Sequence, residues 1–168
     1  MFEESANDRL KKMPLFKKAH EIMEISLKIS ESVSMHDLEN LSEAEGDLLA
    51  GYAQYIRENA TIIPAKISGA VAVDLYDLKM ENATIIRKAA RELSTYCSGL
   101  AMYGYKNTDY LQLLRDEVEE FRVLFAEWVK TFDEWNYIID RWGLFNPPGI
   151  NYDTHDPDDD IPFDPDEL

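Results

Sequence analysis

The strongest constraint on how this chain can fold is a regular apolar seam in its C-terminal third. Between residues 111 and 142, large apolar side chains recur at alternating steps of three and four residues, with charged side chains between them. This 3.5-residue period predicts one helix over residues 111–142, about 48 Å long at 1.5 Å per residue. The seam consists of Leu111, Leu114, Val118, Phe121, Phe125, Trp128, Phe132, Trp135, Ile139 and Trp142.

The seam is rich in aromatic rings, which need more cover than one partner helix provides. We therefore expect these rings to lie in a multi-helix core, in an oligomer interface, or in both. The core or oligomer residues predicted on this basis are Phe121, Phe125, Trp128, Phe132, Trp135 and Trp142.

Three further helices are expected before the seam. Apolar residues keep helical spacing from Pro14, which suits the first turn of a helix, to about residue 33. Ser42 followed by Glu45 fits a capping box and starts a second helix that runs to about residue 73. A third apolar face extends to about residue 100, and Gly104 ends that helix. The predicted fold is all-α, an up-down-up-down four-helix bundle.

The second predicted helix contains a proline. Pro64 removes one backbone hydrogen bond, so we expect the helix to kink there. Small residues beside it, including Ala65 and Gly69, predict a close approach of another backbone.

The predicted bundle spans residues 13–145 and is flanked by two polar segments. Residues 1–12 are expected to form a flexible N-terminal arm. Residues 146–168 are rich in aspartate and proline, contain no lysine or arginine, and carry half of the formal net charge of −16. Such a tail buries too little apolar surface to offset its ordering entropy, so we expect it to be disordered.

The acidic tail has four alternative interpretations. It could bind Ca²⁺, serve as a solubilising tail, bind a partner through Ile161 and Phe163, or contact the basic N-terminal patch of its own chain. Several of its carboxylates match EF-hand loop spacing, but Ile161 stands where that loop needs glycine, and prolines intrude. No metal site is therefore predicted. The matching carboxylates are Asp156, Asp158, Asp160, Asp164 and Glu167.

Two groups of basic residues could form an anion-binding patch on an otherwise acidic chain. The simpler interpretation, which we prefer, is that they lie on solvated helix faces. The overall negative charge repels phosphate backbones and anionic lipid, which argues against nucleic-acid and membrane binding. The patch residues are Arg9, Lys11, Lys12, Lys17, Lys18, Arg87, Lys88 and Arg91.

No arrangement of residues predicts an enzyme, a cofactor or a catalytic group. The chain lacks the Glu-x-x-His pairs of di-iron bundles, a glycine-rich phosphate loop and a zinc cluster. The single cysteine, Cys97, allows no internal disulfide and suits a small buried side chain in a reducing compartment. No apolar run is long enough to span a membrane, and the N-terminus has no signal-peptide pattern, so the predicted location is cytoplasmic.

Several stretches resemble one bacterial protein family. Residues 55–70, YIRENATIIPAKISGA, resemble the stretch around Ser-Ile-Pro-Ala-Asn-Ile-Ala-Glu-Gly in four-helix bundle proteins encoded by intervening sequences of large-subunit ribosomal RNA genes. Residues 14–29 resemble the first helix of that family, and residues 89–100 follow the spacing of its third. Gly104-Tyr105 and Asp109-Tyr110 resemble the start of its fourth helix. The resemblance covers about residues 13–140.

The resemblance implies a homo-oligomer, because members of this family form ring-like homopentamers. It supplies no enzymatic activity and no catalytic residues. We therefore expect a non-enzymatic oligomeric scaffold or adaptor with an unidentified protein partner. The alternative comes from a relative, the accessory protein of diversity-generating retroelements, which binds a reverse transcriptase and nucleic acid through a basic surface. On that alternative, this chain would bind nucleic acid or a reverse transcriptase through its local basic patch.

Overall fold

The computed structural model describes residues 6–36 and 41–157. Within these residues all regular secondary structure is helical, which confirms the all-α prediction. The five helices are α1 (Ala6–Lys12), α2 (Pro14–His36), α3 (Glu43–Val71), α4 (Tyr76–Met102) and α5 (Thr108–Val129).

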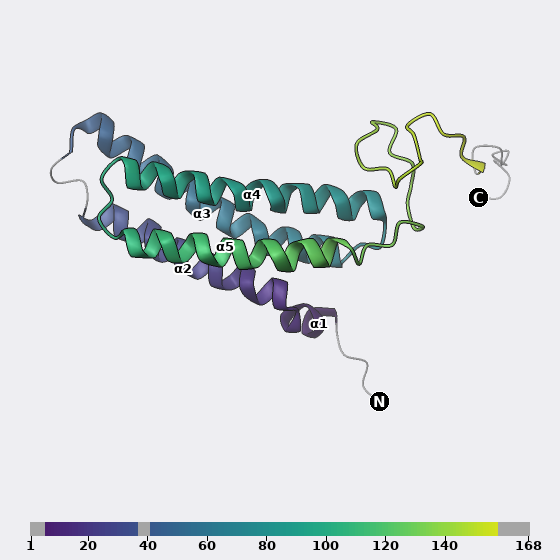
Figure 1. Ribbon diagram of the computed structural model, residues 1–168, viewed down its shortest axis with the longest axis horizontal. Coiled ribbons are helices and arrows are strands. Elements are labelled where there is room, and N and C mark those ends of the chain that lie inside the picture. The colour runs from purple at the N-terminus through teal and green to yellow at the C-terminus, as the bar shows by residue number, and fades with distance from the viewer. Residues whose placement is uncertain (1–5, 37–40, 158–168) are drawn as a thin grey trace, which may run out of the picture.

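The four long helices lie side by side (Figure 1). Helix α2 contacts α3 and α5, and α4 contacts the same two helices, so α2 and α4 lie diagonally across from each other. Helix α1 packs against α2 and occupies residues 6–12 of the segment predicted as a flexible arm. Residues 1–5 of that segment lie outside the described residues.

Three helix ends, the starts of α2 and α3 and the end of α4, follow the predicted local signals. Pro14 is the first residue of α2. The capping box at the start of α3 is confirmed, because the Glu45 amide donates to Ser42 Oγ and the Glu45 carboxylate accepts from the Ser42 amide at 3.0 Å. Gly104 follows the end of α4 with a φ of +89°, a conformation that glycine adopts without strain.

The core between the long helices is aliphatic along most of its length. Isoleucine and leucine side chains from α2, α3 and α4 are fully enclosed there, and Phe121 of α5 is the largest of the enclosed side chains. Gly99 lets α4 approach α3 closely, because a Cβ at this position would lie 2.9 Å from the Tyr52 ring.

The prediction of one helix through residue 142 is wrong. Helix α5 ends at Val129, and residues 130–157, which we call the C-terminal loop, contain turns in its place. The cause is competition for backbone hydrogen bonds. Thr131 Oγ1 donates to the Trp128 carbonyl at 2.7 Å, and Asp133 Oδ1 accepts from the Trp135 amide at 3.0 Å. Short polar side chains thus take up groups that a longer helix would have paired.

This ending divides the predicted seam. Phe121 and Phe132 are buried, and Phe125 and Trp128 are partly buried against the core. Trp135 and Trp142, by contrast, are each 91% exposed. The prediction that these two tryptophans lie in the core is therefore wrong for the single chain, and their place in an oligomer interface stays a prediction.

The residues around the helix-interior proline occupy different environments. Helix α3 continues through Pro64, which is buried, and Ser68 Oγ donates to the Pro64 carbonyl at 3.0 Å. The expected kink stays a prediction. Gly69 faces α4 closely, since a Cβ there would lie 3.4 Å from Asn82 Oδ1, whereas Ala65 is exposed.

Only part of the predicted acidic tail is described. Residues 146–157 belong to the C-terminal loop, and residues 158–168 lie outside the described residues. None of the helices in the described ranges combines the length and the apolar character that a membrane crossing requires.

Candidate functional site

The C-terminal loop is fastened to the start of α4. The Tyr76 amide donates to the Asn136 carbonyl at 2.7 Å, and Asn136 Nδ2 donates to the Asp74 carbonyl at 3.3 Å. Phe132 turns inward, where its ring meets Trp128 edge-on at 4.8 Å and Lys79 Nζ lies 5.6 Å from its centroid. The loop therefore begins from a fixed position on the helices.

A single carboxylate organises the middle of this loop. Asp140 accepts backbone hydrogen bonds from Phe145, Leu144 and Trp142, each at 2.9 Å. Asn146 closes the same turn, because its amide side chain accepts from the Asp140 amide and donates to the Asp140 carbonyl. The hydrogen bond from Phe145 contributes most to holding the pKa of Asp140 below its ordinary value.

The turn is closed again further along the chain. Arg141 Nη1 donates to the carbonyls of Tyr152 and Thr154, both at 2.9 Å. Gly143, with a φ of +74°, lies against Tyr152, because a Cβ at this glycine would be 3.6 Å from Tyr152 Cβ. Residues 140–154 therefore form a hydrogen-bonded unit.

Large apolar side chains project from this hydrogen-bonded loop into solvent. We call them the exposed aromatic set, although it includes two aliphatic members. Most other exposed large apolar side chains among the described residues are only about half exposed. Both tryptophans of the set, by contrast, are almost fully exposed. The set consists of Trp135, Ile138, Trp142, Leu144 and Tyr152.

Removing the organising carboxylate should loosen the loop and leave the helices intact. In an Asp140→Ala variant we expect the amides of Trp142, Leu144 and Phe145 to exchange with deuterium about tenfold faster, because each loses a charge-assisted acceptor. Hydrogen-exchange mass spectrometry measures this change, and amides of α5 provide the internal reference. Asp153→Ala, which removes an exposed aspartate of the same loop, is the matched control. Equal protection in both variants would contradict the role given to Asp140.

The same hydrogen bonds predict how the loop responds to acid. The pKa of Asp140 in the folded chain is lowered from 3.8. The ionised carboxylate therefore stabilises the loop fully above about pH 3.8, and this stabilisation is lost as the pH falls through the lower folded pKa. Loop protection in the wild-type chain should therefore persist down to mildly acidic pH.

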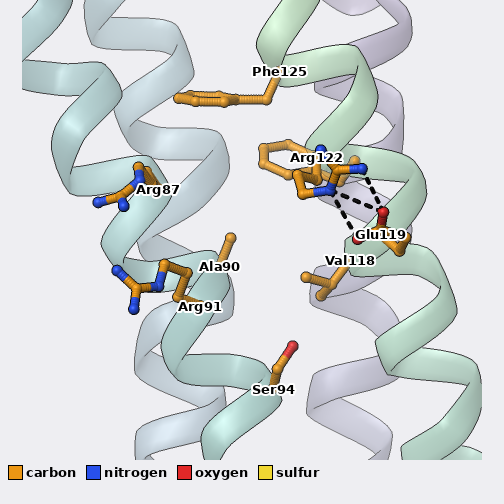
Figure 2. A pocket seen from close by; sticks show the side chains of 9 residues that line it. Arg87, Ala90, Arg91, Ser94, Val118, Glu119, Arg122 and Phe125 are labelled. Carbon is orange, nitrogen blue, oxygen red and sulfur yellow. Dashed lines mark hydrogen bonds and ion pairs between the residues drawn. The ribbon is translucent and has the colours of Figure 1, made fainter.

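A second surface feature lies between α4 and α5. It is an apolar groove of about 330 Å³ with arginine side chains along its edges (Figure 2), which we call the arginine groove. Phe125 reaches from α5 across the gap toward α4, and Arg87 and Arg91 lie along α4 (Figure 2). The lining residues are Arg87, Ala90, Arg91, Ser94, Val118, Glu119, Phe121, Arg122 and Phe125.

The three arginines of the groove differ in how they are paired. Arg122 Nε donates to both carboxylate oxygens of Glu119 at 2.9 Å, so its charge is largely compensated. Arg87 and Arg91 are exposed, and neither guanidinium forms a hydrogen bond or ion pair with any part of the chain that the structure describes. The α4 edge of the groove therefore offers two uncompensated positive charges beside an apolar floor.

The structure does not bring the predicted basic patch together. Arg9, Lys11, Lys12, Lys17 and Lys18 belong to α1 and α2, whereas Arg87, Lys88 and Arg91 belong to α4, which lies diagonally across from α2. Lys18 is also engaged within the protein, because its Nζ lies 2.6 Å from Glu117, 2.8 Å from Glu120 and 2.8 Å from Glu21. Lys88 pairs with Glu92 at 3.8 Å.

Other candidate groups have structural explanations. Cys97 is buried, and its burial raises the pKa of the thiol to about 11, so it is present as the neutral thiol at pH 7. Among the described residues, no three histidine, cysteine, aspartate or glutamate side chains cluster as metal ligands. Most of the tail carboxylates with EF-hand spacing lie outside the described residues.

Sequence reasoning missed the roles of Asp140, Asn146 and Arg122. A signal for the loop was present, because Asp133, Asn136, Asp140 and Gly143 are turn-forming residues inside the apparent helix pattern. No comparable signal existed for Arg122, whose place opposite Arg87 and Arg91 depends on how α4 and α5 are aligned.

Comparisons with protein-family models, with curated proteins and with solved structures find no match to this chain.

Proposed function

We propose that this chain is a self-associating, non-enzymatic helical scaffold or adaptor of the cytoplasm, and that the exposed aromatic set is its assembly surface. The observation that carries the proposal is the 91% exposure of Trp135 and Trp142 on a loop held by hydrogen bonds. A tryptophan left in water forgoes a large apolar burial, and clustered exposed apolar side chains mark interaction sites.

The loop is well suited to this role for two physical reasons. Tryptophan is one of the residues enriched among those that dominate binding energy at protein interfaces. Asp140 and Asn146 hold the loop in one shape before binding, so association costs less ordering entropy than it would for a flexible segment.

The proposed architecture is the up-down-up-down four-helix bundle, with α1 packed outside it. It is supported by the short connections between consecutive helices and by the contacts of α2 and α4 with both α3 and α5. The family that the sequence resembles forms ring-like homopentamers, which makes a ring of copies the expected form of the assembly. A protein partner of that assembly would be bound in addition.

The alternative function, as a nucleic-acid or reverse-transcriptase accessory protein, has one supporting observation. Arg87 and Arg91 are exposed and have no partner within the described residues. Two observations weigh against it: the formal net charge is −16, and Lys18 is occupied by three carboxylates.

Size-exclusion chromatography with light scattering, recorded at 260 and 280 nm, tests both functions. We expect the full chain to elute as a discrete multiple of its 19.4 kDa mass, free of nucleic acid. The double variant Trp135→Ala/Trp142→Ala should shift toward the monomer, with each tryptophan contributing about 30-fold in affinity if it acts as a typical interface anchor.

Met102→Ala is the control for this experiment. Met102 is 78% exposed and lies outside the C-terminal loop, so its removal should leave the mass unchanged. A monomeric wild-type chain at micromolar concentration would overturn the self-association proposal. Co-eluting material with strong absorbance at 260 nm would favour the nucleic-acid alternative in its place.

A further inference from the structure

The arginine groove combines two chemical features that together define its ligand. Its floor is apolar, formed mainly by Val118, Phe121 and Phe125. Arg87 and Arg91 line its α4 edge, and their uncompensated guanidinium groups extend along the outer side of α4 (Figure 2). Such a groove suits a segment in which an apolar side chain is flanked by carboxylates. A phosphate backbone would satisfy the charges and leave the floor uncovered.

One segment of this chain has that composition. Residues 158–168, DDDIPFDPDEL, contain six carboxylate side chains and no basic residue, with Ile161 and Phe163 between them. The exposed aromatic set is a poorer candidate occupant of the arginine groove. The carboxylates beside its tryptophans, Asp133 and Asp140, already accept hydrogen bonds within the loop.

The position of the groove indicates which copy supplies the segment. Residues 146–157, yellow-green in Figure 1, lie beyond the end of the helices at which α4 begins. Along α4, Arg87 lies about 16 Å from Tyr76. Phe163 follows Pro157 by six residues, a span of at most about 20 Å when fully extended. Residues 158–168 of the same chain would thus have to be almost fully extended to reach even the near edge of the groove. This limit does not apply to residues 158–168 of a neighbouring copy.

We propose that the arginine groove binds residues 158–168 of a second copy of this chain, with Phe163 and Ile161 on the apolar floor and the neighbouring aspartates against Arg87 and Arg91. This site is distinct from the assembly surface formed by the exposed aromatic set. It gives the acidic segment a specific partner surface and links copies head to tail.

Fluorescence anisotropy with a labelled synthetic peptide of residues 156–168, titrated with the full chain, tests the proposal. We expect saturable binding that weakens as salt is raised, because the contacts include exposed charges. Arg87→Glu/Arg91→Glu in the protein, and Phe163→Ala in the peptide, should each weaken binding at least about tenfold, the factor for loss of one strong contact. Arg57→Glu/Lys106→Glu, which reverses two exposed charges outside the groove, is the matched control and should bind nearly as the wild type does.

Three results would overturn the proposal. The first is absence of saturable binding both by the wild-type chain and by full-length Phe163→Ala protein, whose own segment competes less. The second is equal binding by the groove variant and its control, with circular dichroism confirming that both are folded. The third is binding that is absent in wild-type chain diluted until light scattering finds it monomeric, and present in full-length Phe163→Ala protein at the same concentration, which would show that each chain fills its own groove. The Trp135→Ala/Trp142→Ala variant should still bind the peptide, so failure of the assembly proposal and failure of this one are distinguishable.

Discussion

Replacing Phe121 with alanine should lower the free energy of unfolding by about 3–5 kcal/mol, the cost of deleting a fully enclosed phenylalanine ring. Phe121 is 1% exposed, and its ring lies 6.1 Å from that of Phe125. The alanine variant loses the buried apolar surface and leaves a cavity that rigid helices close only in part. Urea denaturation followed by far-UV circular dichroism measures the change.

Trp135→Ala is the control, because it removes an exposed aromatic side chain in place of a buried one. Both residues belong to the same 3.5-residue apolar pattern, but Trp135 is 91% exposed, so its removal should change the stability of the single chain by less than about 0.5 kcal/mol. Trp128 is partly buried, so the loss of stability on its replacement by alanine should lie between those of the other two variants. A large loss at Trp135 in dilute, monomeric protein would contradict the end of α5 at Val129.

This pair of residues shows what the pattern could and could not predict. Periodicity reports which side chains would share a face if the helix continued, and from residue 111 to Val129 it does continue. Beyond Val129, Thr131, Asp133 and Asp140 offer the backbone alternative hydrogen bonds, and Phe132 already fills the space beside Lys79. Which of these local options prevails depends on tertiary packing, and the periodic pattern contains no information about it.

The candidate surfaces were predictable to different degrees. Trp135 and Trp142 stood out from the sequence, but their predicted burial in the core is wrong for the single chain, and the oligomer interface stays a prediction. Arg87 and Arg91 were singled out as basic residues, but their relation to an apolar floor required the alignment of α4 with α5. The prediction that the basic residues of α1, α2 and α4 form one patch was wrong. Residues of like charge need not lie close together in the fold.

The second large effect is expected at Lys18, which joins α2 to α5. Its Nζ lies 2.6 Å from Glu117 and 2.8 Å from Glu120, and the lysine and Glu117 side chains are only 16% and 18% exposed. Lys18→Met keeps the aliphatic stem and removes the charge, which leaves carboxylates facing one another at the helix interface. We expect a loss of about 1.5–3 kcal/mol, the range for hydrogen bonds to charged groups, measured by urea denaturation at pH 7.

Lys17→Met is the matched control, because Lys17 is exposed on the same helix and should change stability by less than about 0.5 kcal/mol. Adding Glu117→Gln to Lys18→Met should restore part of the loss, since it removes one of the stranded charges. If the double variant is no more stable than Lys18→Met alone, the loss comes from packing and not from charge.

The pH dependence follows from the sign of the pKa shift at Lys18. The hydrogen bond to Glu117, followed by those to Glu120 and Glu21, raises the pKa of this lysine above 10.5. A raised folded pKa means that the stabilisation is complete below the unfolded value and is lost only as the pH rises through the folded value. The stability difference between wild type and Lys18→Met should therefore stay constant from neutral pH to about pH 10 and shrink only in stronger alkali. A difference that already disappears near pH 8 would show that the lysine is not held by these carboxylates.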